Sequence, residues 1–185
     1  TTEIYTLSLH DALPILFGRE QQAKEFFDAQ VAHIEPILEK EKTGLSVAFF
    51  AVASDGTVTV RKPNDYVSSM IELAGGTYSL NGYVEEEENA LSTLKMQMED
   101  FYAAEKDADI LIYNGTIEGE LTSIAELVQK NSLFADFKAV KSGQVYTTGS
   151  NFYQQTSGTC DFIEDLNKVL TGDTDAEYRF LKKLD

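Results

Sequence analysis

The chain has no tryptophan, one cysteine and two histidines among its 185 residues. Because Cys160 stands alone, neither an internal disulfide nor a cysteine-based zinc site can form. His10 and His33 are the only histidines. No other segment can therefore supply the imidazole base that a Ser-His-Asp or Cys-His site needs. The phosphate-binding patterns GxxxxGK[ST] and GxGxxG are also missing. These absences argue against hydrolases and nucleotide-binding enzymes.

Long hydrophobic runs and positive charge are scarce as well. The longest apolar run, residues 45–53, is far too short to cross a bilayer. Lys and Arg number 15 against 31 Asp and Glu, for a net charge of −16. Such an acidic surface repels nucleic acid and anionic lipid, so neither is expected as a partner. The length and the 43% hydrophobic content describe about one ordinary globular domain.

Residues 1–15 (TTEIYTLSLHDALPI) match the translation of one reading frame of a common short-read sequencing adapter. We expect this segment to be an artefact and exclude it from the fold. The alternative is a genuine strand, because four apolar residues alternate loosely within it. On the adapter interpretation the gene was cut at Leu16, and the native N-terminus is missing together with any signal peptide.

Apolar periodicity predicts helices and strands in alternation. Residues 16–42 are typical of one long helix that Pro36 kinks or divides. Short apolar runs at 45–53, 109–113 and 144–147 indicate strands covered on both faces, and 57–61 completes a hairpin. The further helices are expected at 64–73, 94–106, 121–130, 153–170 and 173–184. This alternation predicts an α/β fold, a three-layer Rossmann-like lobe with a mainly parallel sheet.

Polar and aromatic residues follow three of the predicted strands, where open parallel sheets bind their ligands. The combination of aromatic faces with amide groups suits a medium-sized organic ligand. The candidates are Tyr113, Asn114, Asn151, Phe152, Tyr153 and Gln154. Packing of the next helix on the sheet would explain Phe152 and Tyr153 equally well. Tyr83 in the acidic loop 78–89, Arg61 and Tyr66 are further candidates, with salt bridging and packing inside the lobe as the alternative.

No metal site is predicted. The glutamates at 85–88 lack the spacing of a calcium loop, His33 is expected at the surface or an interface, and Cys160 is expected to be a buried inert thiol. A metal-dependent α/β enzyme remains an alternative, favoured if acidic residues such as Asp55 and Asp109 converge. Asp109, however, begins its strand and is expected at the opposite edge. A truncated lobe without activity of its own is the third hypothesis.

Three stretches together resemble a known family. Residues 65–76 (DYVSSMIELAGG) look like a helix that ends in Ala-Gly-Gly, and residues 98–112 (MEDFYAAEKDADILI) look like a helix followed by a strand. Residues 140–146 (VKSGQVY) look like the turn into the last strand. In this order they resemble the C-terminal lobe of ABC-importer substrate-binding proteins, in the group that carries iron–siderophores, haem and cobalamin. The family's usual proline before the strand is absent from residues 107–109.

The resemblance implies that residues 16–42 are an interlobe helix, that 43–185 are the C-terminal substrate-binding lobe, and that the N-terminal lobe is missing. It implies a bacterial, extracytoplasmic component, periplasmic or lipid-anchored at the cell surface. This component is not an enzyme and uses no cofactor; it captures a metal chelate or corrinoid between two lobes for delivery to ABC permease subunits. Glu99, or Asp100 with a one-residue shift, matches the carboxylate that docks on the permease; an ordinary exposed carboxylate is the alternative. Membrane contact is expected only through a lost lipid anchor or the permease.

Overall fold

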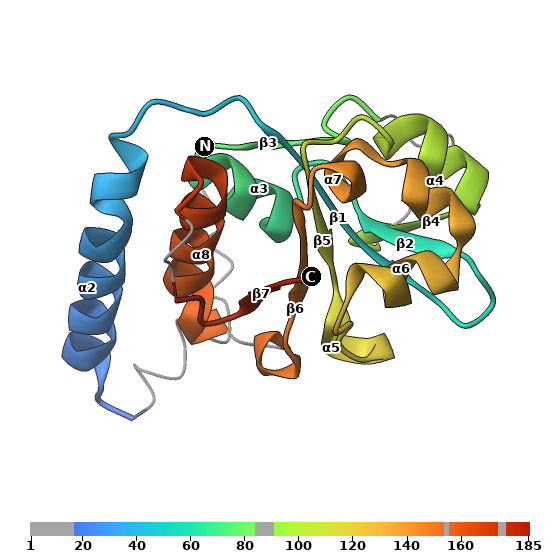
Figure 1. The fold of residues 1–185 in the computed structure, drawn as a ribbon. Coiled ribbons are helices and arrows are strands. Elements are labelled where there is room, and N and C mark those ends of the chain that lie inside the picture. Colours follow the sequence, from blue (N-terminus) through green and yellow to red (C-terminus); the bar gives the residue numbers. More distant parts are fainter. Residues whose placement is uncertain (1–16, 84–90, 154–155, 174–176) are drawn as a thin grey trace, which may run out of the picture.

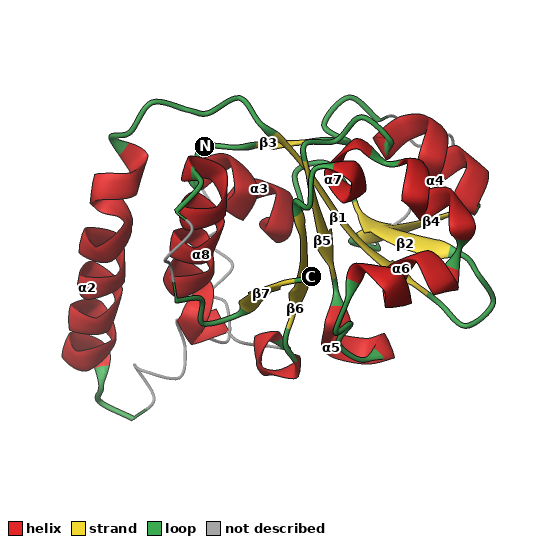
Figure 2. Ribbon diagram, viewed as in Figure 1, coloured by secondary structure: helices red, strands yellow, loops and turns green. Residues whose placement is uncertain are grey.

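The computed structural model describes residues 17–83, 91–153, 156–173 and 177–185. A seven-stranded sheet runs through the molecule with helices on both faces (Figures 1 and 2). The strands follow the order β4-β2-β1-β5-β6-β7, and β3 pairs with β1. Their bounds are β1 (Ser46–Val52), β2 (Val58–Arg61), β3 (Thr77–Tyr78), β4 (Thr93–Met96), β5 (Ile110–Tyr113), β6 (Val145–Thr148) and β7 (Leu181–Lys183).

Parallel pairing occupies the centre of the sheet. Strand β1 runs parallel to β3 and β5, and β5 runs parallel to β6. The antiparallel strands β2, β4 and β7 extend the two sides. The predicted α/β fold with a parallel sheet core is therefore confirmed. The predicted hairpin is confirmed too, with Val52 opposite Val58, and Asp55 closes its turn by accepting the Thr57 N–H at 3.0 Å.

The helices form a layer on each face of this sheet (Figure 1). One layer holds α3 (Tyr66–Leu73) and α8 (Thr159–Thr171), and α2 (Glu20–Leu38) packs on the outside of α8. The other layer holds α4 (Met98–Glu105), α6 (Ile124–Lys130) and α7 (Lys138–Lys141). The short α5 (Gly115–Glu118) follows β5 directly.

Two neighbouring phenylalanines on β1 supply both halves of the core. Successive side chains of a strand point to opposite faces. Phe50 packs against Phe101 of α4, with ring centroids 4.9 Å apart. Phe49 points the other way, towards Phe152 at 6.3 Å, and Phe152 in turn lies 4.3 Å from Phe162 of α8. The continuous apolar run in β1 is thus explained by burial on both faces, as predicted for a central strand.

The helix predicted over residues 94–106 is wrong in its first part. Residues 93–96 form β4, whose Leu94 lies opposite Val60 of β2, and α4 begins only at Met98. Leu94, Met96 and Met98 recur with a period of two, which is the strand pattern, whereas the residue types of 94–98 (LKMQM) favour a helix. The edge of β2 that does not pair with β1 decides between strand and helix, because the backbone N–H and C=O groups along it need hydrogen-bond partners, which β4 supplies.

The closing helix predicted over residues 173–184 is also wrong where the structure describes it. Residues 181–183 form β7, antiparallel to β6, with Leu181 opposite Thr148. The buried carboxylate of Asp165 accepts hydrogen bonds from the backbone N–H groups of Arg179, Phe180 and Leu181 at 2.7 to 3.3 Å. This strand therefore depends on a side chain from α8, which no local pattern reveals.

The other helices are shorter than predicted. Helix α2 ends at Leu38, two residues after Pro36, so the proline lies in its last turn instead of dividing it. Helix α8 begins at Thr159, because residues 150–152 and 156–158 form separate 3₁₀ turns. Helix α6 begins at Ile124, where the Ser123 hydroxyl accepts the N–H of Glu126 as a cap.

Candidate ligand-binding site

The carboxyl ends of four strands lie at one edge of the sheet, which we call the rim. Tyr113 of β5 lies opposite Phe50 of β1 and Thr147 of β6, so these parallel strands end together. Strand β4 ends there as well, since Met96 and Val52 both lie opposite Val58 of β2. The loops predicted to bind a ligand are thereby brought to a common edge.

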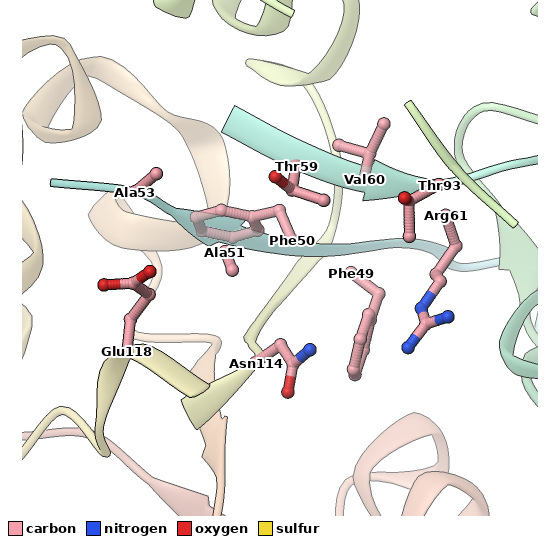
Figure 3. A pocket seen from close by; sticks show the side chains of 10 residues that line it. All are labelled: Phe49, Phe50, Ala51, Ala53, Thr59, Val60, Arg61, Thr93, Asn114 and Glu118. Atoms are coloured by element: carbon pink, nitrogen blue, oxygen red, sulfur yellow. The ribbon is translucent and has the colours of Figure 1, made fainter. Parts of the chain in front are cut away.

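A pocket of about 130 Å³ opens on the sheet surface at this rim (Figure 3). Figure 3 shows the Phe49 ring beside the Arg61 guanidinium, with the Asn114 amide on the other side of the ring. The small, half-buried side chains of Ala51, Ala53 and Thr59 leave this part of the sheet surface uncovered. The pocket is lined by Phe49, Phe50, Ala51, Ala53, Thr59, Val60, Arg61, Thr93, Asn114 and Glu118.

Asn114 is fixed in place by capping α5. Its Oδ1 accepts hydrogen bonds from the Thr116 N–H at 3.3 Å and the Thr116 hydroxyl at 2.7 Å, and the Thr148 hydroxyl lies at 3.4 Å. These three donors determine the amide orientation, because the nitrogen cannot accept them. In Figure 3 the nitrogen points towards Phe49. Asn114 therefore offers the pocket a rigid hydrogen-bond donor.

Arg61 contributes positive charge from β2. Its Nη2 donates to the Tyr66 hydroxyl at 3.0 Å, and its guanidinium carbon lies 4.9 Å from the centre of that ring. The Asp65 carboxylate lies 3.9 Å away and partly balances the charge. The expected packing inside the lobe is thus present, and it holds Arg61 where it lines the pocket. Arg61 and Tyr66 form one unit.

A larger apolar hollow of about 550 Å³ adjoins this unit, between α3 and the start of α8. Phe152 links the two hollows, since it lines this one and packs on Phe49. Phe152 therefore both packs between the helix and the sheet and lines a hollow, whereas the sequence left open which of these it would do. The hollow is lined by Tyr66, Ser69, Met70, Leu73, Phe152, Thr156 and Thr159.

The prediction that Tyr113 contacts a ligand is wrong. The side chain is 0% exposed, and its ring packs 5.8 Å from Phe50, on the opposite side of the sheet from Phe49. Lys130 Nζ lies 5.5 Å from the ring centre and covers it. The side chain of the last residue in a strand can point to either face of the sheet, and that of Tyr113 points to the face covered by the layer with α4.

The remaining rim candidates lie apart from the pocket lining. Asn151 donates through Nδ2 to the backbone carbonyl of Arg179 at 2.9 Å, which ties the loop after β6 to the approach to β7. Tyr153 is 57% exposed and stands free for an external contact. Gln154 lies outside the residues that the structure describes.

Two candidates lie near α4 instead. Tyr83 lines a shallow hollow with Lys95 and Asp100, away from Arg61 and Asn114. The structure therefore does not bring Tyr83 into the pocket. Glu99 is exposed in the first turn of α4, just after β4 reaches the rim. Its carboxylate is accessible to a partner that approaches this edge.

Sequence reasoning missed Phe49 and Glu118. The sequence predicts Phe49 as part of the core and the structure confirms this, but the side chain also borders the pocket. Ala51 shares its face of β1, and Ala53 follows just after the strand; these small residues at every second position could have indicated an uncovered strip. Glu118 carried no such signal, because it is an ordinary acidic residue in a short helix.

The acidic pair that would favour an enzyme does not converge. Asp109 accepts the Ser46 N–H at 2.9 Å at the amino end of β1, whereas Asp55 lies beyond the carboxyl end of that strand. Burial acts to raise the pKa of Asp109, but hydrogen bonds from Lys138 and Ser46 prevail and lower it. Cys160 is buried, which raises the pKa of its thiol and fits the predicted inert role.

The turn after β5 leaves no room for a side chain at Gly115. A Cβ there would lie 2.5 Å from the Thr148 carbonyl oxygen and 3.0 Å from Glu120 Cα. We expect Gly115→Ala to lower the free energy of unfolding by about 2 kcal/mol through this overpacking. Gly82→Ala, where no atom of the described residues lies within 4 Å of the added Cβ, is the control. Equal chemical-denaturation midpoints for the two variants would contradict the prediction.

The pocket at the rim combines apolar lining with a hydrogen-bond donor and a cation, a combination that suits an organic ligand. Residues 17–152 match the family model described as periplasmic binding protein, and the chain belongs to this family. The family consists of binding proteins, not enzymes. No curated protein matches the chain. Among the described residues, none of the helices has the length and apolar character needed to span a membrane.

Several solved structures share the fold. The TroA-like periplasmic binding protein FepB from Veillonella parvula has a TM-score of 0.69 and 13% identity over 95% of this chain and 60% of its own. An ABC-type Fe³⁺-hydroxamate transport system protein from Saccharomonospora viridis has a TM-score of 0.70 and 16% identity over 86% and 53%. The periplasmic heme binding protein HutB of Vibrio cholerae has a TM-score of 0.67 and 13% identity over 89% of this chain and 61% of its own. The chain thus spans little more than half the length of these structures.

Proposed function

We propose that this chain is the C-terminal lobe of the extracytoplasmic solute-binding component of an ABC importer, and that its rim holds a metal chelate or corrinoid. The observation that carries the proposal is the convergence of Phe49, Arg61 and Asn114 on one open pocket. Membership of the periplasmic binding protein family supports capture instead of catalysis. Fold neighbours named for Fe³⁺-hydroxamate transport and for heme support a chelate as the ligand class.

The chemistry of the pocket fits such ligands. Phe152 and the small accessible part of Phe49 offer apolar contact to an organic ligand, Asn114 offers a donor, and Arg61 offers a cation to acidic ligand oxygens. Exposed Tyr153 stands at the same edge and can add a further aromatic face. An iron–siderophore or haem, which combines apolar bulk with anionic oxygens, matches this set better than a small polar solute.

A second lobe supplies the other wall in this proposal, and residues 16–42 connect the two lobes while 43–185 form this one. Helix α2 carries exposed aromatic side chains, Phe26 at 52% and Phe27 at 65% exposure, and only its Ile37 is buried. Phe17, just before the helix, is 70% exposed. Large exposed apolar residues in such number are characteristic of a surface that another part of a protein covers. Residues 1–15 remain assigned to the sequencing adapter.

Delivery to the permease would use Glu99. Its carboxylate is exposed at the start of α4, on the rim side of the lobe. A single exposed ion pair contributes little affinity. Paired with a second carboxylate on the other lobe, it would set register and encounter rate with basic residues of the permease.

Asn114→Asp tests the ligand-binding role while it preserves the fold. The aspartate keeps the oxygen that caps α5 and replaces the amide donor with a negative charge beside the ligand. In the two-lobed parent protein we expect the affinity for a ferric siderophore, haemin or cobalamin to fall at least about tenfold, the loss of one hydrogen bond at a charged or polar group. Titration calorimetry with all three compounds measures this and identifies the ligand.

Asn131→Asp is the matched control, since Asn131 also caps a helical turn, by accepting the Leu133 N–H at 2.9 Å, away from the pocket. Its affinity should equal that of the unaltered protein. If none of the three ligands binds the parent, or if both variants bind equally well, the pocket is not the ligand site.

A further inference from the structure

Helix α2 meets the rest of the lobe along α8 (Figure 1). His33 lies at that contact, since it pairs with Glu164 of α8. Its Nε2 lies 2.8 Å from Glu164 Oε2. Asp161 precedes Glu164 by three residues on α8, so both carboxylates occupy the same face of that helix. One ligand atom from each of the three residues lies within 4.8 Å of the others. A nitrogen and two carboxylates thus converge from segments 131 residues apart.

We propose that His33, Asp161 and Glu164 form a binding site for a divalent transition-metal ion of the zinc type, which would join α2 to α8. This site is distinct from the rim pocket, with which it shares no residue. The sequence predicts no metal site, because the histidine and the carboxylates lie far apart along the chain.

Each carboxylate is held by a cation on one of its oxygens. Arg179 Nη1 lies 2.5 Å from Asp161 Oδ2, and Lys168 Nζ lies 3.0 Å from Glu164 Oε1. The second oxygen of Glu164 faces His33. Such outer contacts orient metal ligands and offset the repulsion between neighbouring carboxylates. The arrangement is therefore partly organised before any ion arrives.

The donor set selects the class of ion. Zinc accepts imidazole nitrogen and carboxylate oxygen at about 2.0–2.2 Å in tetrahedral geometry. His33, Asp161 and Glu164 supply three of the four zinc ligands, and a water molecule can supply the fourth. The His33 and Glu164 side chains are 37% and 35% exposed, so water can reach the ion. In tetrahedral geometry with such bonds the ligand atoms lie about 3.3–3.6 Å apart. The widest separation in the cluster, 4.8 Å, must therefore shrink by a little more than about 1 Å, which the exposed side chains can supply by rotation. Calcium needs about six to eight oxygens, and magnesium needs about six in an octahedron, which this cluster does not provide.

The expected consequence is mechanical. Only Ile37 of α2 is buried, so few contacts fix the helix against the lobe. An ion held by one residue of α2 and two of α8 would add a strong, directional link in the C-terminal half of α2. If α2 connects two lobes, a consequence that rests on the proposed function, bound metal would also limit their relative motion.

Zinc titration of the full 185-residue chain, purified without a metal-affinity tag, tests the site. Calorimetry should show one ion bound per chain, unaffected by an equal concentration of Mg²⁺. His33→Gln keeps a hydrogen-bond partner for Glu164 and removes the ligand nitrogen. We expect it to weaken zinc binding by at least about tenfold, the loss seen even when outer-shell partners are removed. Asp161→Asn and Glu164→Gln should each weaken it similarly.

Two matched controls separate this site from unspecific binding to an acidic surface. His10→Gln removes the other histidine of the chain, and Asp136→Asn removes an exposed carboxylate that is paired with Lys141 at 3.2 Å. Both should bind zinc like the unaltered protein. In hydrogen exchange, zinc should slow the α2 amides of the unaltered chain but not those of His33→Gln.

The proposal fails if the unaltered chain binds no zinc, or if His33→Gln and Glu164→Gln both bind it with unchanged affinity. A zinc-induced rise in the melting temperature that persists in all three ligand variants would likewise place the ion elsewhere. None of these outcomes depends on the rim pocket, so the proposed function is tested independently.

Discussion

Asp165→Ala is expected to lower the free energy of unfolding by about 4 kcal/mol. The Asp165 carboxylate accepts the backbone N–H groups of Arg179 at 2.9 Å, Phe180 at 2.7 Å and Leu181 at 3.3 Å. Alanine would leave up to three donors without a partner, two of them in a buried setting, and each costs about 1–3 kcal/mol. Strand β7 would then lose its anchor to α8, and the free edge of β6 would be exposed.

Chemical denaturation followed by circular dichroism measures the effect, since the chain has no tryptophan for fluorescence. Asp161→Ala, four residues earlier on α8, removes a half-buried carboxylate and should cost less than about 1 kcal/mol. Burial raises the pKa of Asp165 although the amide hydrogen bonds lower it. Asp165→Asn, which keeps one acceptor oxygen without charge, should therefore cost clearly less than Asp165→Ala. Equal losses for Asp161→Ala and Asp165→Ala would show that β7 does not depend on this carboxylate.

The second large effect concerns pH. Glu105, at the end of α4, is 1% exposed, and neither of its carboxylate oxygens has a hydrogen-bond partner among the described residues. The neighbouring Ser79 hydroxyl donates instead to the Val47 carbonyl at 2.9 Å. Burial raises the pKa of Glu105 from 4.5 to about 7. The folded protein therefore keeps a proton that the unfolded chain releases between these two values.

The sign follows from this difference in bound protons. Below pH 4.5 both states hold the proton, and the burial of Glu105 as a neutral acid has its lowest cost. As the pH rises to about 7, stability is lost, because folding must retain or take up a proton. A difference of this size corresponds to about 3 kcal/mol. Carboxylates whose pKa is lowered, such as Asp109 and Glu164, act in the opposite direction at acidic pH.

Glu105→Gln isolates the contribution, because glutamine does not ionise. The stability of the unaltered protein relative to this variant should fall by about 3 kcal/mol between pH 4.5 and 8. Glu99→Gln, on the exposed face of the same helix, should differ from the unaltered protein by less than about 1 kcal/mol throughout. A pH-independent difference between Glu105→Gln and the unaltered protein would mean that the buried carboxyl does not titrate in this range.

Local patterns predicted the central elements because these elements depend little on their partners. The run in β1 and the shorter one in β5 are apolar at nearly every position, which only a strand covered on both faces explains at this length. Helix α3 carries its own start signal, as the Asp65 side chain accepts the Val67 N–H at 2.9 Å. The parallel core and the position of Asn114 at a strand end followed from these segments.

Local patterns failed where a partner decides. The segment that forms β4 is compatible with helix and strand, and the open side of β2 makes the choice. Strand β7 forms because β6 offers an edge and Asp165 holds the approach to it. Tyr113 is buried instead of facing the rim, and the buried Phe49 also lines the pocket, since a strand pattern cannot say which face another layer will cover.

The amino-acid sequence by itself determined the acidic surface, the lack of a nucleophile–histidine site, the alternating α/β order and the resemblance to a family of binding proteins. These properties depend on composition and on neighbours within a few residues. Only the tertiary structure decided which strands form the sides of the sheet, which side chains line the rim pocket, and that His33 meets Asp161 and Glu164. Each of these depends on contacts between segments distant in the chain, where packing and the need to pair backbone groups outweigh local preference.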